Sequence, residues 1–209
     1  MLEARSLAAR RGFATLFEGL EFSLAAGEAL VVSGPNGSGK TTLLRMLAGL
    51  AAPAEGEIRW EGAPVQPFDA RLRDAVAFNG HLPALKDELT AFENLAAWAT
   101  LENERADGQA IGRALDRVAL GRRGRIAARA LSQGQRRRIG LARLAVSRRR
   151  LWILDEPLTA LDSDGVALLE TLLAAQLGGG GLVVAASHQP LPVPAAQLRP
   201  LDLAATPGR

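Results

Sequence analysis

At 209 residues, the chain is long enough for one large α/β domain or for one domain with a lobe attached. It contains no cysteine, which excludes disulfides, thiolate metal sites and cysteine nucleophiles, and its aromatic content of 4% argues against a platform that stacks single-stranded nucleic acid. The net charge is +3 and almost all of the positive charge comes from arginine, which we interpret as a compositional habit rather than as the sign of a polyanion partner. No apolar run is long enough to span a membrane and no hydrophobic signal segment follows the N-terminus, so we expect a cytosolic chain that reaches a membrane only through a partner.

Short apolar runs alternate with amphipathic stretches, which indicates strands alternating with helices and a mainly parallel sheet. In chain order we predict a strand at 29–33, a helix at 41–49, a strand at 57–62, amphipathic helix from 89 to about 130, a helix at 132–146, a strand at 151–154, a helix at 163–176 and a strand at 182–186. Thr90 and Glu93 form a capping-box pattern, and Ser132 is a natural N-cap. The segment from Pro190 onward is rich in proline, and we expect it to be loosely ordered.

The segment that follows the first predicted strand has two glycines bracketing four residues and then Lys-Thr. Glycine lets backbone N–H groups turn inward around a β-phosphate, and the start of the next helix adds a partial positive charge. A lysine ammonium there can bind the β- and γ-phosphates, and a threonine hydroxyl is an oxygen ligand for Mg²⁺. The alternative, an unrelated glycine-rich turn, does not explain the strand, loop and helix together. The predicted ATP-binding residues are Gly34, Pro35, Asn36, Gly37, Ser38, Gly39, Lys40, Thr41 and Thr42, and Thr41 is also a predicted metal ligand.

Two acidic residues end the strand predicted at 151–154. Asp155 is placed to reach Mg²⁺, and Glu156, on the opposite side of the backbone, to polarise the water that attacks the γ-phosphate. The alternative is an N-cap pair that closes a strand-to-helix turn. Four apolar residues before the pair, and the phosphate loop upstream, favour the catalytic interpretation.

Together these features resemble the ATPase subunit of ABC transporters over essentially the whole chain. Leu131–Gln135 is similar to that family's signature, normally Leu-Ser-Gly-Gly-Gln, with Gln133 in place of the first glycine. Leu158–Asp162 resembles its D-loop, and Ser187-His188 its switch histidine. The resemblance implies ATP and Mg²⁺ as cofactors and a head-to-tail homodimer. In that dimer the signature residues of one subunit, which are Ser132, Gln133, Gly134 and Gln135, meet the ATP of the other.

The resemblance also implies the fold, an α/β P-loop NTPase of the ABC-ATPase type. We expect a mainly parallel core sheet with an antiparallel β subdomain and an inserted α-helical subdomain. The whole chain, 1–209, is then one ABC ATPase domain. Its expected parts are a nucleotide-binding core at 1–80 and 135–200, a helical subdomain with the signature at 81–134, and a tail at 201–209.

Both histidines of the chain fall at positions that matter in this family. His188 ends a predicted strand, where a neutral imidazole can hydrogen-bond the γ-phosphate. His81 stands where the family usually has the Q-loop glutamine; the alternative is an exposed loop histidine. The family's adenine-stacking aromatic would fall near Arg11, and the nearest ring is Phe13, so adenine recognition is left open.

The stretch Gly80–Leu95 resembles the haem-exporter ATPases of cytochrome c maturation. This implies a peripheral subunit at the cytoplasmic face of a bacterial inner membrane, bound to an integral membrane subunit of the CcmB type. Other short ABC exporters or importers are the alternative within the class. ABC ATPases of ribosomes or DNA usually have two ATPase domains or a long coiled coil, and a small-molecule kinase would not need the signature. The arginine runs at 136–138 and 148–150 are expected to be solvated faces, and no nucleic-acid partner is expected.

Overall fold

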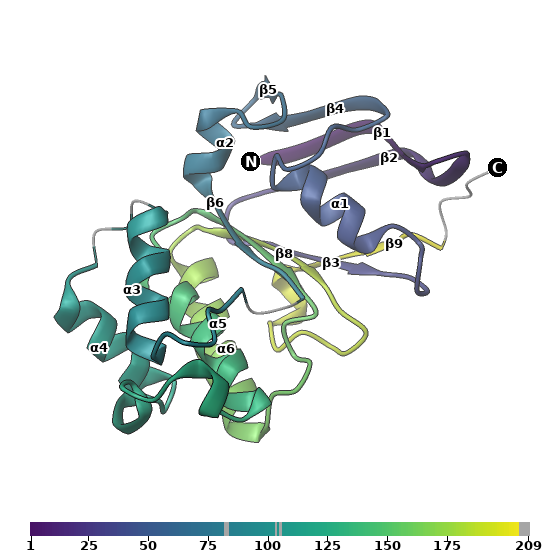
Figure 1. The fold of residues 1–209 in the computed structure, drawn as a ribbon. Coiled ribbons are helices and arrows are strands. Elements are labelled where there is room, and N and C mark those ends of the chain that lie inside the picture. Colours follow the sequence, from purple (N-terminus) through teal and green to yellow (C-terminus); the bar gives the residue numbers. More distant parts are fainter. Residues whose placement is uncertain (82–83, 103, 105, 205–209) are drawn as a thin grey trace.

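The computed structural model describes residues 1–81, 84–102, 104 and 106–204, and it contains two sheets with helices between and beside them (Figure 1). One sheet is antiparallel with the strand order β2-β1-β4-β5, and the other has the order β6-β7-β8-β3-β9. The strands are β1 (Leu2–Arg11), β2 (Ala14–Leu24), β3 (Ala29–Ser33), β4 (Glu55–Trp60), β5 (Ala63–Val65), β6 (Val76–Asn79), β7 (Leu151–Asp155), β8 (Leu182–Ala186) and β9 (Leu198–Asp202). The helices are α1 (Lys40–Leu47), α2 (Ala70–Ala75), α3 (Ala91–Leu101), α4 (Gly108–Arg117), α5 (Gln133–Val146) and α6 (Ser163–Gly178), with 3₁₀ turns at Gly121–Arg123, Ala128–Ala130 and Ala195–Gln197.

The second sheet is parallel, which confirms the prediction from the alternation of strands and helices. Each of its strand pairs, β6 with β7, β7 with β8, β8 with β3 and β3 with β9, runs in the same direction. The carboxyl ends of all these strands therefore lie at one edge of the sheet. The residues that follow β3, β6, β7 and β8 meet there.

Side chains that alternate between the two faces of the parallel sheet pack into two separate cores. Leu151 and Ile153 of β7 pack with residues of β1, β2 and α1, whereas Trp152 and Leu154 pack with residues of α3, α4, α5 and α6. In Figure 1, α1 accordingly lies between the two sheets, and α3 to α6 cover the other face of the parallel sheet. Both faces of β7 are buried, as its uninterrupted apolar run indicates.

The segment between β6 and α3 is held by one side chain from each of two helices. Asn94 of α3 is 4% exposed; its side-chain oxygen accepts from the Lys86 N–H at 2.8 Å and its amide group lies 3.0 Å from the Lys86 carbonyl oxygen. Arg143 of α5 donates to the carbonyl of Ala84 at 2.5 Å and stacks over the ring of Trp98, 6.0 Å from its centre. Burial lowers the pKa of Arg143. The start of α3 is further fixed by the predicted capping box, which the structure confirms.

The expectation that the segment after Pro190 is loosely ordered is wrong for its described residues. The segment after Pro190 contributes the edge strand β9, which pairs with β3, and Leu203 beyond it is 2% exposed and donates its N–H to the Ser33 carbonyl at 3.0 Å. A proline-containing strand is tolerated there because an edge strand needs hydrogen bonds on one side only.

The expectation of solvated faces at the arginine runs 136–138 and 148–150 holds for Arg148 and Arg150, which are exposed, but not for the whole of either run. The side chains of Arg138 and Arg149 are only 13% exposed. Arg149 approaches the buried carboxylate of Glu104 to 3.4 Å, which connects the segment before β7 to the segment after α3. These guanidinium groups are buried because neighbouring carboxylates and carbonyls supply acceptors for them.

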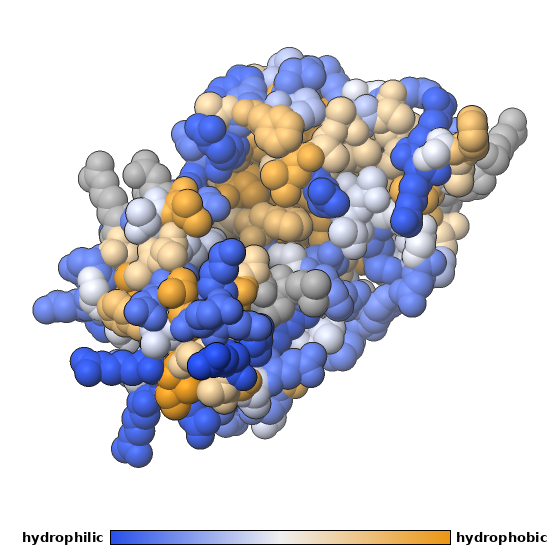
Figure 2. Space-filling view, in the orientation of Figure 1, coloured by the Kyte–Doolittle hydropathy of each residue, from blue (hydrophilic) through white to orange (hydrophobic). Residues whose placement is uncertain are grey.

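On the face shown in Figure 2, hydrophobic residues gather over the middle and upper part. Figure 2 shows that the helices in the lower part of this face carry mainly hydrophilic residues. None of the helices in the described ranges combines the length and the apolar character that a membrane span requires.

Candidate functional site

The loop between β3 and α1 adopts backbone conformations that require glycine. The φ angle is 141° at Gly34 and 98° at Gly39, values that other residues rarely adopt. A Cβ atom at Gly34 would lie 2.8 Å from Ser38 Oγ, and one at Gly39 would lie 3.1 Å from Leu16 Cβ. The loop is therefore closed tightly on itself and against β2.

Lys40 begins α1, and its side chain folds back over this loop. Its ammonium group donates to the carbonyl oxygens of Gly34 at 2.7 Å and of Pro35 at 3.1 Å. Hydrogen bonds from an ammonium to an anion are stronger than those to neutral carbonyls, so an arriving phosphate would compete well for it. The hydroxyl of Ser38 is buried, and no described residue hydrogen-bonds to it. The loop thus has a cation and an unused polar group beside the start of a helix, which are features of an anion site.

A hydrogen bond connects the first turn of α1 to the end of β7. Thr41 Oγ1 donates to Asp155 Oδ2 at 2.9 Å, and Asp155 is 5% exposed. The hydroxyl and the carboxylate are hard oxygen donors of the kind that Mg²⁺ prefers, and Mg²⁺ usually completes its shell with phosphate oxygens and water. These two residues therefore fit a magnesium ion that is bound together with a nucleotide.

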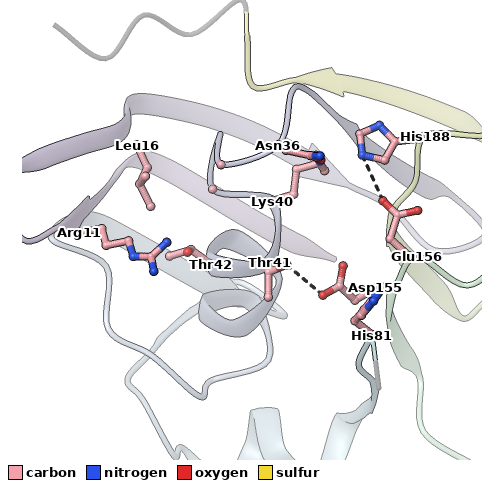
Figure 3. A pocket seen from close by; sticks show the side chains of 12 residues that line it. Arg11, Leu16, Asn36, Lys40, Thr41, Thr42, His81, Asp155, Glu156 and His188 are labelled. Carbon is pink, nitrogen blue, oxygen red and sulfur yellow. Dashed lines mark hydrogen bonds and ion pairs between the residues drawn. The ribbon is translucent and has the colours of Figure 1, made fainter. Parts of the chain in front are cut away.

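The next residue, Glu156, faces His188 across the ends of β7 and β8. His188 Nε2 lies 3.5 Å from Glu156 Oε1. Glu156 has a φ of 51°, in the left-handed region, and its N–H donates to the Ala186 carbonyl at 2.9 Å. The hydrogen bond to β8 holds this uncommon conformation, which points the carboxylate away from the sheet and toward the imidazole (Figure 3).

These groups surround a single cavity of about 360 Å³ (Figure 3). Its lining residues are Arg11, Leu16, Asn36, Gly37, Gly39, Lys40, Thr41, Thr42, His81, Asp155, Glu156 and His188. Gly34, Pro35 and Ser38 of the predicted ATP-binding set lie in the loop but do not line the cavity. His81 also lines it, on the side of Asp155, but it is exposed, as the alternative of an exposed loop histidine expects, so its role in the site stays a prediction. Leu16 is a lining residue that sequence reasoning missed.

The signature residues do not line this cavity. Ser132 caps α5: its hydroxyl accepts from the Gln135 N–H at 3.3 Å while Gln135 Oε1 accepts from the Ser132 N–H at 3.0 Å. Ser132 and Gln133 are exposed. A Cβ atom at Gly134 would lie 3.5 Å from the Ala160 carbonyl oxygen, so this glycine packs beside the segment predicted as the D-loop.

Two arginines of α5 interact with acidic residues at or beyond the end of β7. Arg138 Nη2 donates to both carboxylate oxygens of Asp162, at 2.7 Å to Oδ1 and 2.9 Å to Oδ2. Burial lowers the pKa of Arg137, and the negative charges of Asp155 and Glu156 act on it in the opposite direction. Arg137 is therefore a positive charge near the two carboxylates. The arginine run was the only sequence signal for it, and it did not distinguish Arg137 from its neighbours.

The fold is that of an ATP-binding cassette. The family model described as "ABC transporter" matches residues 17–159, and the chain therefore belongs to the ABC transporter family and is an ATPase of it. Its relatives include the cytochrome c biogenesis ATP-binding export protein CcmA 2 of Cupriavidus metallidurans, which is 48% identical over 208 residues, covering 100% of this chain and 97% of that protein. The protein of the same name, CcmA, from Nitrosomonas europaea is 48% identical over 91% of this chain and 90% of that protein.

Solved structures have the same architecture. A putative ABC transporter ATP-binding protein from Pyrococcus furiosus is similar with a TM-score of 0.82, at 24% identity over 98% of both chains. A dimeric ATP-binding cassette in a post-hydrolysis state, bound to ADP and Pi, is similar with a TM-score of 0.78, at 25% identity over 90% of this chain and 88% of that one. The predicted fold class is thereby confirmed.

Proposed function

We propose that the chain drives the ABC transporter that serves c-type cytochrome biogenesis, as its ATP-hydrolysing subunit at the cytoplasmic face of a bacterial inner membrane. Relatives with that name are 48% identical and matched over nearly their whole length, which supports the same role here. A transporter ATPase works with a membrane partner, and we propose an integral subunit of the CcmB type. The single structural observation that carries the ATPase part is the meeting of the ends of β3, β7 and β8 at one cavity.

We propose the following roles for the phosphate end of the site. Lys40 exchanges the carbonyls of Gly34 and Pro35 for oxygens of the β- and γ-phosphates, because an anion is the stronger acceptor. Thr41 and Asp155 would hold Mg²⁺, which supplies positive charge to the phosphates when it is bound. The loop glycines keep the backbone open to the β-phosphate.

Water activation is assigned to the pair of residues at the ends of β7 and β8. Glu156 polarises the attacking water and accepts its proton, and the neighbouring His188 orients that carboxylate and hydrogen-bonds the γ-phosphate. His81 lines the cavity beside Asp155 and is proposed as a further polar contact to the nucleotide. It takes the place of the glutamine that is usual in the family.

We also propose that two copies of the chain form the working ATPase. The start of α5 would contribute to the neighbour's nucleotide site. The residues concerned are Ser132 and Gln133, which are exposed, and Gly134 and Gln135, which are half-buried. The similarity of the fold to a cassette whose structure is dimeric supports this arrangement. Residues 81–134 would act as the helical subdomain that carries the signature, beside a nucleotide-binding core at 1–80 and 135–200.

A complementation experiment tests the assignment to cytochrome c biogenesis. In a bacterium that lacks its own copy of this ATPase, the wild-type chain should restore covalently bound haem in c-type cytochromes, and Lys40→Ala should not. Haem-stained gels measure the restoration, and Arg45→Ala, an exposed change in the same helix, is the control. Purification of the tagged wild-type chain should recover a small hydrophobic membrane protein. Normal c-type cytochromes in the strain with Lys40→Ala would contradict the proposed function.

A further inference from the structure

One end of the nucleotide cavity is lined by residues of the antiparallel sheet (Figure 3). Arg11 is the last residue of β1, and Leu16 lies in β2. The pairing of these strands shifts register between Ala9 and Arg10: Ala9 stands opposite Phe17 and Arg10 opposite Thr15, which leaves Leu16 without an opposite residue. An irregularity of this kind re-aims side chains and is common beside functional sites.

Leu16 and Arg11 differ in how firmly they are held. Leu16 packs directly on the phosphate loop, since a Cβ atom at Gly39 would lie 3.1 Å from Leu16 Cβ. The guanidinium of Arg11 forms neither a hydrogen bond nor an ion pair with any residue in the described ranges. Its neighbour Arg10 is instead paired with Glu55 at 2.6 Å. Figure 3 shows the Arg11 side chain extending toward Thr42 in the first turn of α1.

The two ends of the cavity suit different parts of a nucleotide. Glu156 and His188 stand at one end, beside the loop that takes the phosphates, so the γ-phosphate belongs there. The base must then extend in the other direction, toward Arg11 and Leu16. Phe13, the aromatic residue nearest to Arg11 in the sequence, is fully exposed in the turn after β1 and does not line the cavity.

We propose that Arg11 holds the nucleobase, over the apolar surface of Leu16, and that the chain accepts GTP as readily as ATP. This inference rests on nucleotide binding at the phosphate loop. A guanidinium plane stacks on the face of any purine, so face-on contact does not select adenine. The edge of the guanidinium offers only donors. Guanine presents two acceptors, O6 and N7, to such an edge, whereas adenine presents one acceptor beside an amino donor. Neither the face-on contact nor the contact with the guanidinium edge therefore favours ATP over GTP.

Calorimetric titration of the full chain with Mg-ATP, Mg-GTP and Mg-tripolyphosphate tests the proposal. Wild type should bind ATP and GTP with dissociation constants within about threefold of each other. Arg11→Ala should weaken both nucleotides by about 3- to 30-fold, the range expected for loss of a cation–π contact, and should leave tripolyphosphate unchanged. Arg10→Ala, which removes the adjacent, paired arginine, should change none of the three. Arg11→Tyr keeps a planar group that can stack on either purine and should retain most of the affinity for both nucleotides.

Several results would overturn the inference. Unchanged nucleotide affinity in Arg11→Ala would remove Arg11 from the base site, and equal losses in Arg11→Ala and Arg10→Ala would indicate a general charge effect. A wild-type preference for ATP of more than tenfold would show that another group selects adenine. If wild type bound neither nucleotides nor tripolyphosphate, the phosphate site itself would be refuted together with the inference. Thermal melting of each variant checks that losses of affinity do not come from unfolding.

Discussion

Among single residues, Glu156 is the position where backbone strain and proposed chemistry coincide. A φ of 51° places a residue with a side chain in the left-handed region, at a cost of about 1–3 kcal/mol. The hydrogen bond from its N–H to Ala186 helps to hold that conformation. An ordinary β conformation would turn the carboxylate elsewhere, so the strain and the contact with His188 belong together. This supports the assignment of Glu156, rather than Asp155, to water activation.

Glu156→Gln should keep nucleotide binding and lose turnover. Glutamine has nearly the same shape but cannot accept the proton of the attacking water, so ATP hydrolysis should fall by about 100-fold or more. Phosphate release and a nucleotide-binding titration measure the two effects separately. Glu170→Gln makes the same chemical change at an exposed position of α6 and should behave as wild type. Turnover within twofold of wild type in Glu156→Gln would remove Glu156 from this role.

At the scale of elements, the segment between β6 and α3 carries His81 into the site and is stabilised from the helical side. Asn94 contacts the backbone of Lys86, Leu89 and Thr90. These contacts replace the regular hydrogen bonds that a loop lacks. A buried amide in such a position contributes to folding, and its removal leaves backbone groups without partners.

Asn94→Ala should lower the free energy of unfolding by about 1–3 kcal/mol, because buried backbone groups lose their partner. For a chain of this size each kcal/mol corresponds to about 2–4 °C in melting temperature. Thr100→Ala, an exposed change on the same helix that removes one hydrogen bond to Ala96, is the matched control and should shift melting little. A melting temperature equal to wild type in Asn94→Ala would mean that the contacts around residues 86–90 do not contribute to stability.

The same elements show what the sequence could and could not predict. The predicted strand at 182–186 matches β8, and the strand at 151–154 falls one residue short of β7, because both are buried on two faces and read as continuous apolar runs. The strand β1 was not predicted. Its pairing with β2 shifts register three times and Ser6 has a φ of 47°, so no alternating pattern survives in the sequence.

The candidate site likewise contains residues that the sequence could predict and residues that it could not. Glycine spacing and acidic residues after apolar strands point to the phosphate loop, Asp155 and Glu156, whose positions follow from the common direction of parallel strands. Local sequence patterns could not predict that Leu16 and Arg137 lie near the site. Leu16 faces the cavity because of the irregular pairing of β1 and β2, and Arg137 approaches the carboxylates through the packing of α5. Both depend on tertiary contacts that no local pattern encodes.

For the whole molecule, the proposed site is complete only when a second copy is added. The start of α5 is exposed and away from the chain's own cavity. The ion pair between Arg138 and Asp162 fastens this helix to the segment that follows Glu156. A nucleotide that contacts the signature of the neighbouring copy would therefore be sensed close to the hydrolysing residues of that copy. Binding and hydrolysis at the two sites would be coupled through this connection.

The dimer can be tested by adding charge where the signature should meet the neighbour's phosphate. In Glu156→Gln with Mg-ATP, light scattering should show a dimer, since slow hydrolysis leaves the nucleotide between the subunits. Ser132→Asp in that background should give monomers, because aspartate caps a helix as well as serine but repels a γ-phosphate. Thr171→Glu, on an exposed face of α6, adds the same charge and should leave the dimer intact. ATP binding to the Ser132→Asp monomer should persist through Lys40 and the phosphate loop. A dimer of undiminished stability in Ser132→Asp would place the subunit contact elsewhere on the molecule.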